Sequence, residues 1–342
     1  MKHLKLTISL FCIIPSILNS GCKEDPIIPP NICQTTPVEL NQPLFYPQLI
    51  LSQQNPLTVE GIALGRKLYY DTLLSHGGPH AGKACATCHI QNQSFSLGTS
   101  GTAIIPHVNL AWKTHFLWHG QIDEGLEAAM MFEVNDFFNT DVRHLQKTEF
   151  YPSLYLCAFG DSVISPENTA FALAQFLRSM TATNSRYDRY LRGQGQLTTS
   201  EKDGMNIFLS EKGDCFHCHT IPLLHDNSFH NIGLENEFNS SNWGRFSVTG
   251  DSNDIGKFMT PTLRNIELTA PYMHDGRYAT LMEVVEHYNS QVKVSNFVDP
   301  ILTKNNKVNG LQLTEDDKLD LVAFLKTLTD QSFINNPDFS AP

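Results

Sequence analysis

Two five-residue runs, Cys85–His89 and Cys215–His219, share the pattern Cys-x-x-Cys-His. Two thiols three residues apart can add to the two vinyl groups of one porphyrin, and the histidine that follows then lies under the iron. The pattern therefore predicts two covalently attached c-type haems, with His89 and His219 as the proximal iron ligands. The predicted attachment residues are Cys85, Cys88, Cys215 and Cys218.

The alternatives for these runs are a zinc ribbon and a redox dithiol. A zinc ribbon would make the histidine after each cysteine pair a coincidence, and a redox dithiol needs one pair rather than two. Two haems are thus the favoured interpretation. A chain of 342 residues is long enough for two domains of ordinary size, one for each haem.

Residues 1–21 have the layout of a signal peptide. Lys2 and Lys5 make a basic start, and Leu6–Leu18 is an apolar stretch too short to span a membrane. Asn19–Cys22 then resembles a bacterial lipobox, although Asn19 stands where leucine is usual. We expect a periplasmic lipoprotein anchored to the membrane only through a lipid on Cys22. Ordinary secretory cleavage is the alternative.

Residues 22–43 contain several prolines and are predicted to form an extended tether. The chain carries 24 basic and 35 acidic side chains, a balance that argues against nucleic acid as a partner and suits a basic protein partner. Cys33 and Cys157 lie outside the haem motifs, the signal peptide and the lipobox. They either form a disulfide, which the compartment permits, or remain two free thiols.

Hydrophobic periodicity and capping residues predict a mostly helical fold without convincing strands. Two c-type cytochrome domains, residues 44–195 and 196–342, would each wrap one haem. Residues 227–256 are too polar to be part of a core. The helices are expected at Val59–Leu74, after the N-cap Ser165, at Thr198–Leu209, at Leu281–Tyr288 and after the N-cap Thr314.

Aromatic and histidine side chains gather shortly after the first haem motif: His107, Trp112, His115, Trp118 and His119. Core packing for the tryptophans and surface positions for the histidines are the alternative to a role beside the haem.

The chain resembles the bacterial di-haem cytochrome c peroxidases, including the related di-haem enzyme that matures methylamine dehydrogenase. The resemblance covers about residues 44–330. It rests on the two haem motifs, on Leu64–Asp71 before the first, and on Thr260–Asn265 and Ala270–Gly276 after the second. It is weakest over residues 227–256.

The resemblance implies a division of labour between the haems. The haem on His89 would bind and cleave peroxide, and the haem on His219 would accept electrons from a donor. Trp118 would take the family's role of relay between them. As the distal ligand of the second haem we favour Tyr288, which stands where the peroxidases have methionine and the methylamine relative has tyrosine. Met273 is the competing candidate.

The chain departs from the family where a glutamine and a glutamate lie over the peroxide-binding face, since the matching positions fall near Ala128 or Ala129 and Phe138 or Asn139. Glu133 is our candidate for this acid–base role. Asp136 is an alternative, and His107, His115 or His119 could take the role or cap the first haem at rest. The resemblance also allows a calcium ion between the domains, but Ala103 stands where the family has an asparagine ligand.

These features predict a peroxidase that reduces hydrogen peroxide to water with electrons from a small cytochrome c or cupredoxin, and a homodimer is compatible with the family. One alternative is a di-haem oxidase of a protein or organic substrate that acts through a high-valent state, which Tyr288 favours. Another is a non-enzymatic di-haem electron carrier, which the missing glutamine and glutamate favour. An open coordination position on the first haem distinguishes an enzyme from a carrier.

Overall fold

The computed structural model describes residues 33–40, 42–43, 45–49, 51–97, 103–304, 307 and 310–342. The predicted signal peptide, the lipobox with Cys22 and most of the predicted tether lie outside these residues. Residues 34–342 form one compact unit. No helix in the described part of the chain is both long enough and apolar enough to cross a membrane.

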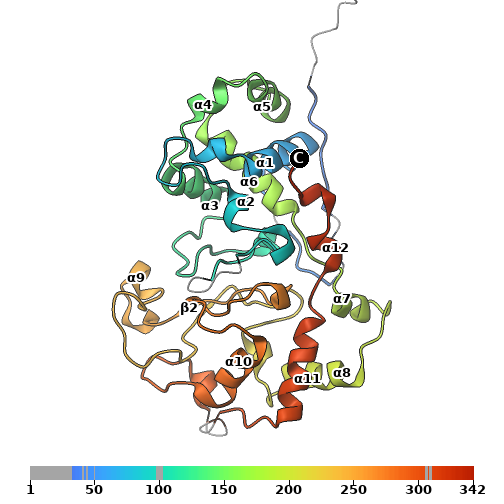
Figure 1. Cartoon of the computed structure of the whole chain (residues 1–342), viewed down its shortest axis with the longest axis vertical. Coiled ribbons are helices and arrows are strands. Elements are labelled where there is room, and N and C mark those ends of the chain that lie inside the picture. Colours follow the sequence, from blue (N-terminus) through green and yellow to red (C-terminus); the bar gives the residue numbers. More distant parts are fainter. Residues whose placement is uncertain are drawn as a thin grey trace, which may run out of the picture. The chain divides into compact units, whose positions relative to one another are not determined.

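The half of the chain that contains the first haem motif is built mainly of helices (Figure 1). They are α1 (Val59–Tyr70), η1 (Thr72–Ser75), α2 (Cys85–Cys88), η2 (Gln91–Gln93), η3 (Leu110–Trp112), α3 (Leu126–Phe132), η4 (Glu133–Phe137), α4 (Val142–Gln146), α5 (Tyr151–Phe159), α6 (Pro166–Ser179) and α7 (Arg186–Leu191).

The second half is built in the same way, with shorter helices and longer loops. Its helices are α8 (Thr199–Phe208), η5 (Cys215–His217), α9 (Phe246–Thr249), η6 (Ser252–Asp254), η7 (Ile266–Leu268), α10 (Leu281–Glu286), η8 (His287–Gln291), η9 (Pro300–Thr303), α11 (Glu315–Lys326), α12 (Gln331–Ile334) and η11 (Pro337–Phe339).

The mostly helical prediction is confirmed, with one exception. Two strands, β1 (Phe229–His230) and β2 (Phe258–Met259), pair antiparallel with Phe229 opposite Met259 and His230 opposite Phe258. The expectation of no strand was wrong here because a two-residue strand is too short to show an alternating pattern.

The two N-caps expected from the sequence are confirmed, since the side chains of Ser165 and Thr314 accept hydrogen bonds from the first turns of α6 and α11. Thr198, expected as the first residue of its helix, is instead the N-cap of α8. The first predicted helix is shorter than expected: α1 ends at Tyr70, because Asp71 adopts an extended conformation and its side chain caps η1.

Each half is organised around a close helix pair, α1 with α6 and α8 with α11. A glycine sits at each point of closest approach. A Cβ on Gly65 would lie 1.9 Å from the Ala172 carbonyl oxygen, and a Cβ on Gly204 would lie 1.9 Å from the Asp320 carbonyl oxygen. Only glycine allows two backbones to approach this closely.

Two main hydrophobic cores follow these helix pairs. Phe333 and Phe339, near the end of the chain, pack in the core of the first half, and Tyr187 packs in the core of the second. The two halves therefore exchange segments near the junction, and the domain boundary between residues 195 and 196 stays a prediction. A small third cluster joins Tyr46, Trp112 and Leu223.

Part of the predicted tether is docked. The Val38 amide donates to the Leu57 carbonyl at 2.9 Å, and the Val59 amide donates to the Thr36 carbonyl at 2.9 Å. Glu60, in the first turn of α1, accepts hydrogen bonds from the backbone and side chain of Thr36. Residues 36–38 thus form the entry to α1.

Candidate haem sites

The first haem motif forms the one-turn helix α2, with His89 directly after it. His89 Nδ1 lies 2.8 Å from the Phe95 carbonyl oxygen. A carbonyl only accepts hydrogen bonds, so Nδ1 carries the hydrogen and Nε2 keeps its lone pair. Burial lowers the pKa of His89 to about 4, which keeps the ring neutral. A neutral imidazole oriented by a backbone carbonyl is what iron ligation requires.

The second motif repeats this arrangement. Cys215 begins the short helix η5, and His219 Nδ1 donates to the Leu224 carbonyl oxygen at 2.9 Å. Burial lowers the pKa of His219 to about 4 as well. Each proximal histidine is therefore held by a carbonyl five or six residues further along the chain.

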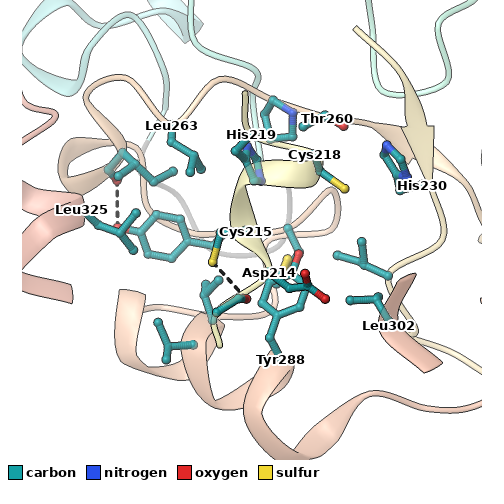
Figure 2. Close-up of a pocket in the computed structure, with 18 of the residues that line it drawn as sticks. Asp214, Cys215, Cys218, His219, His230, Thr260, Leu263, Tyr288, Leu302 and Leu325 are labelled. Atoms are coloured by element: carbon teal, nitrogen blue, oxygen red, sulfur yellow. Dashed lines mark hydrogen bonds between the residues drawn. The ribbon is translucent and has the colours of Figure 1, made fainter. Parts of the chain in front are cut away.

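A largely apolar cavity surrounds the second motif (Figure 2). Cys215, Cys218 and His219 line it, and burial raises the pKa of the Cys215 thiol to about 12. Aliphatic side chains from η7 and the residues before it, from α10, from α11 and from the segment between these two helices form most of its walls: Leu263, Ile266, Leu281, Val284, Val285, Leu311, Leu321 and Leu325. A flat apolar macrocycle fits these residues, with the two thiols and one imidazole at the positions that attachment requires.

Both candidates for the distal position of the second haem line this cavity. Tyr288 comes from the π-helical turn η8, and in Figure 2 it reaches the cavity from the side opposite His219. Within the described part of the chain, the Tyr288 hydroxyl makes no hydrogen bond. Met273 has a left-handed backbone conformation (φ +71°) on the loop before α10. Both residues stay candidates, and the unbonded hydroxyl favours Tyr288.

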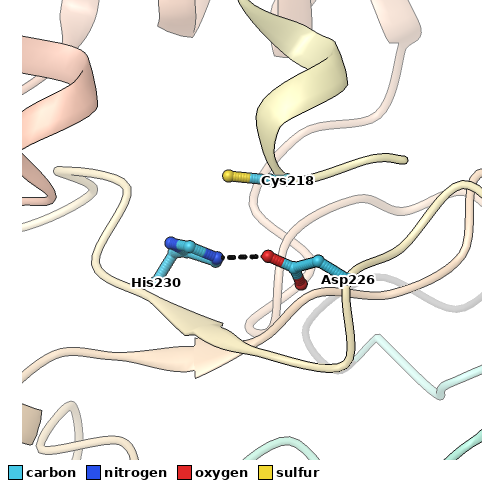
Figure 3. Close-up of side chains that lie close together, drawn as sticks. All are labelled: Cys218, Asp226 and His230. Atoms are coloured by element: carbon cyan, nitrogen blue, oxygen red, sulfur yellow. Dashed lines mark hydrogen bonds and ion pairs between the residues drawn. The ribbon is translucent and has the colours of Figure 1, made fainter.

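A histidine that the sequence interpretation missed also lines the cavity. His230 Nε2 lies 2.7 Å from an Asp226 carboxylate oxygen (Figure 3). Its Nδ1 lies 2.5 Å from a carboxylate oxygen of Asp299. Burial opposes protonation, but these two carboxylates raise the pKa of His230 to about 12. His230 is thus an imidazolium beside Cys218.

His230 and Ile232 fall in residues 227–256, which were predicted to lie outside any core. That expectation was wrong for part of the stretch: Asn231 and Leu234 are buried, and His230 and Ile232 line the cavity, because the stretch folds back through β1 onto the cavity wall. No local pattern marks His230, since its partners lie four residues before it and 69 residues after it.

The acid–base candidate of the first half lies next to its haem motif. Glu133 begins η4, a π-helical turn that continues α3. Burial raises the pKa of the Cys85 thiol, and the charge of Glu133 adds to this rise, so Glu133 is within electrostatic range of the thiol. Burial raises the pKa of Glu133 itself to about 7. The alternative, Asp136, is exposed. Tyr288 and Glu133 thus both lie in π-helical turns, which are rare and frequent at functional sites.

The three histidines considered as caps for the first haem lie elsewhere. The His107 ring is stacked on His89 with centroids 3.5 Å apart, and its Nδ1 is 3.1 Å from the Tyr69 hydroxyl. His115 packs edge-on against Phe229, and His119 packs against Phe258. His107 therefore supports the proximal ligand, and the other two contact the β-ribbon of the second half.

Trp118 lies where a relay would need to be. It lines the cavity of the second motif, and its Nε1 donates to the Ala103 carbonyl at 2.8 Å in the first half. Its own carbonyl accepts a hydrogen bond from the Met259 amide at 2.9 Å. Trp112 instead donates to the Pro47 carbonyl and packs on Tyr46. The structure thus brings Trp118, and not Trp112, to the cavity.

The Thr260–Asn265 motif joins the two halves rather than lining only a haem site. The buried Arg264 guanidinium donates two hydrogen bonds to the buried Asp188 carboxylate at 2.7 and 2.9 Å. Asn265 Nδ2 donates to the Ser94 hydroxyl at 2.8 Å, and its Oδ1 accepts from the Asp330 amide at 2.6 Å. This motif is a structural connector between segments far apart in the sequence.

Two further expectations concern cysteines and calcium. Cys33 and Cys157 are both disulfide-bonded, so neither is a free thiol. The calcium ion that the family resemblance allows would lack a side-chain ligand at its expected place. Ala103 offers no side-chain ligand, and its carbonyl oxygen already accepts the Trp118 indole hydrogen.

Comparison with known proteins agrees with this geometry. The family model for di-haem cytochrome c peroxidase matches residues 59–196. The chain is 33% identical over 293 residues to the methylamine utilization protein MauG of Methylophilus methylotrophus, covering 80% of this chain and 84% of that protein. It is 29% identical over 313 residues to the cytochrome c551 peroxidase of Nitrosomonas europaea, covering 84% of each.

A solved structure shows the same fold. It is the crystal structure of a MauG-like protein associated with microbial copper homeostasis, which has a TM-score of 0.81 and 30% identity and covers 89% of this chain and 99% of that one. The chain therefore belongs to the di-haem cytochrome c peroxidase family, a family of haem-dependent oxidoreductases that includes MauG.

Proposed function

We propose that this chain is a di-haem peroxidase that reduces hydrogen peroxide to water with electrons from a small redox protein. One observation carries the proposal: the two halves place different polar side chains near their haem motifs. The first half has a partly buried carboxyl, Glu133, whose charge acts on Cys85. The second has a phenol, Tyr288, in the cavity of His219. A site that cleaves peroxide needs a proton-transfer group, and a site that only passes electrons needs a second ligand.

The residues of each half would hold one haem covalently. Cys85 and Cys88 form thioethers in the first half, as Cys215 and Cys218 do in the second, and His89 and His219 are the proximal ligands. When bound, the haems supply an iron that binds peroxide and a path for two electrons. The carbonyls of Phe95 and Leu224 orient the two imidazoles.

Glu133 moves the protons of the reaction. As a carboxylate, Glu133 would accept a proton from one oxygen of the peroxide and return it to the other oxygen, which leaves as water. Overall, one hydrogen peroxide, two protons and two electrons give two water molecules. Because the pKa of Glu133 is about 7, the side chain can accept and release a proton near neutral pH.

The electrons come from a partner through the second half. Trp118 is the relay we assign between the halves, since it borders the second cavity and is bonded to Ala103 on the first-half side. The acidic balance of the chain suits a basic donor such as a small cytochrome c or a cupredoxin. The N-terminal signals support a location in the periplasm with a lipid anchor at Cys22.

The test is peroxide-dependent oxidation of a reduced small cytochrome c by the full-length holo-protein, measured as isolated and after half-reduction. We expect catalytic turnover in at least one state, with two cytochromes oxidised per peroxide. Absence of turnover in both states would overturn the peroxidase assignment.

A second candidate is oxidation of a protein or organic substrate, and the position of Tyr288 favours it. The similarity of this chain to a methylamine utilization protein, MauG, and to a MauG-like protein associated with copper homeostasis supports this alternative. The same assay discriminates: peroxide consumed without oxidation of the cytochrome indicates this activity. If peroxide is not consumed at all, a di-haem electron carrier remains.

A further inference from the structure

Lys113 is a buried lysine that the proposed reaction does not use. The residue is only 7% exposed. Its Nζ donates to the Thr260 carbonyl oxygen at 2.9 Å. Lys113 forms no ion pair with any residue in the described part of the chain. A buried ammonium is costly unless its surroundings need the charge, so this side chain calls for an explanation.

The hydrogen bond joins the two halves beside the relay. Lys113 follows η3 in the segment that leads to Trp118, and Thr260 begins the connector motif and lines the second cavity. The same two segments are joined by the Met259 amide, which donates to the Trp118 carbonyl at 2.9 Å. Asn227 Nδ2 adds a bond to the Trp112 carbonyl at 3.0 Å. The ammonium therefore lies at a built junction between the halves.

The family resemblance allows a calcium ion at this junction. The carbonyl oxygens at the junction already accept hydrogen bonds. The Ala103 carbonyl accepts from Trp118, and the Thr260 carbonyl accepts from Lys113. Calcium needs six to eight oxygen ligands, usually with carboxylates among them. The nearby Asp226 carboxylate is bonded to His230 instead (Figure 3).

Of the junction residues, only Asp226 belongs to a potential metal-binding cluster in the described part of the chain. One cluster is Cys218, Asp226 and His230, whose sulfur is a haem attachment atom, and the other is Glu211, Asp214 and His217. A fixed positive charge at the Thr260 carbonyl would also repel a divalent cation.

We propose that the Lys113 ammonium replaces calcium at this junction, as a built-in cation that fastens the connector motif to the Trp118 segment. Lys113 is then a positioning residue, and its charge is felt by the haem of the second half. The proposal depends on haem being bound and not on which substrate is oxidised.

The experiment uses the full-length holo-protein at pH 6, because burial lowers the pKa of Lys113 to about 7 and the side chain is charged below that value. Calcium content is measured by elemental analysis, and the midpoint potentials of both haems are measured by spectroelectrochemistry before and after treatment with EGTA. The variants are Lys113→Met, and Lys147→Met as a control at an exposed lysine.

We expect no stoichiometric calcium and no change of either potential after EGTA. Lys113→Met should lower the midpoint potential of the second haem, because loss of a nearby positive charge favours the oxidised state. Lys147→Met should leave it unchanged. Bound calcium whose removal shifts the potentials would overturn the proposal, and so would a Lys113→Met protein with unchanged potentials. If that variant does not fold, the calcium and EGTA measurements on the wild-type protein still decide.

Discussion

His107 lies face to face with His89: the two ring centroids are 3.5 Å apart and the ring planes differ by 15°. Two rings stacked this closely leave no room for a haem between them, so His107 cannot be the ligand opposite His89 in this arrangement. Its Nδ1 is instead within 3.1 Å of the buried Tyr69 hydroxyl. His107 holds the proximal imidazole in place.

The first prediction concerns this stack. The contact between His107 and His89 is a stack of two rings. His107→Leu should therefore change only the orientation of the His89 ring. We expect a shifted iron–histidine stretching frequency in the resonance Raman spectrum of the first haem, with its coordination number unchanged. Conversion of a six-coordinate haem to an open one in this variant would show that His107 is a cap after all.

Substitution of each candidate distal ligand should show whether Tyr288 or Met273 binds the second haem. A phenolate ligand favours ferric iron, so Tyr288→Phe should raise the midpoint potential of the second haem, by a part of the ~0.8 V range that axial ligands span. Met273→Leu should leave that potential and the absorption spectrum unaltered. Potentiometric titration of both variants measures this, and the reverse result would make Met273 the ligand.

Loss of the Glu133 carboxylate should slow peroxide reduction. We expect Glu133→Gln to lower kcat/KM for peroxide by about 10²–10⁴-fold, the usual contribution of a general acid–base group. The exposed Asp136 provides the matched control, and Asp136→Asn should have near wild-type activity. Equal losses in the two variants would remove Glu133 from this role.

The pH dependence of the wild-type reaction follows from the same residue. Burial raises the pKa of Glu133 to about 7, so the carboxylate that accepts the first proton is lost as the pH falls through 7. We expect kcat/KM for peroxide to be constant above this pH and to fall below it. Glu133→Gln should abolish this limb of the profile, and a limb that persists in the variant would belong to another group.

Trp118 should be needed for electron transfer between the halves. An indole can carry a transient radical and shorten the hop, so Trp118→Phe should slow oxidation of the second haem after peroxide is added. Trp112→Phe is the control, because Trp112 is bonded to Pro47 and packs on Tyr46. Stopped-flow spectroscopy measures the rate, and identical rates in both variants would argue against a relay.

The buried ion pair of Arg264 in the connector motif with Asp188 should contribute strongly to the free energy of unfolding. Asp188→Asn leaves the buried Arg264 guanidinium without its charged partner, which we expect to reduce the free energy of unfolding by about 3–5 kcal/mol. The exposed pair of Arg143 and Asp141 is the comparison, and Arg143→Gln should have no measurable effect. Denaturant titration of the holo-proteins tests both, and a stable Asp188→Asn protein would contradict the first expectation.

Much of the fold and the covalent chemistry could be predicted from local sequence. The Cys-x-x-Cys-His runs specify attachment atoms and proximal ligands because all of these groups lie within one turn of chain. The N-caps Ser165 and Thr314 were predictable for the same reason, since a capping side chain bonds to an amide three residues away.

What the tertiary structure decided depends on residues far apart in the chain. The clamp of Asp226 and Asp299 on His230, the stack of His107 on His89 and the bond from Lys113 to Thr260 have no local signature, because each partner is brought in by a separate loop. Burial, which only packing creates, raises the pKa of Glu133 and lowers that of Lys113. The sequence by itself thus predicted where haem would attach, because the attachment groups are local, and the folded chain decided which side chains lie around each motif and what charge they carry.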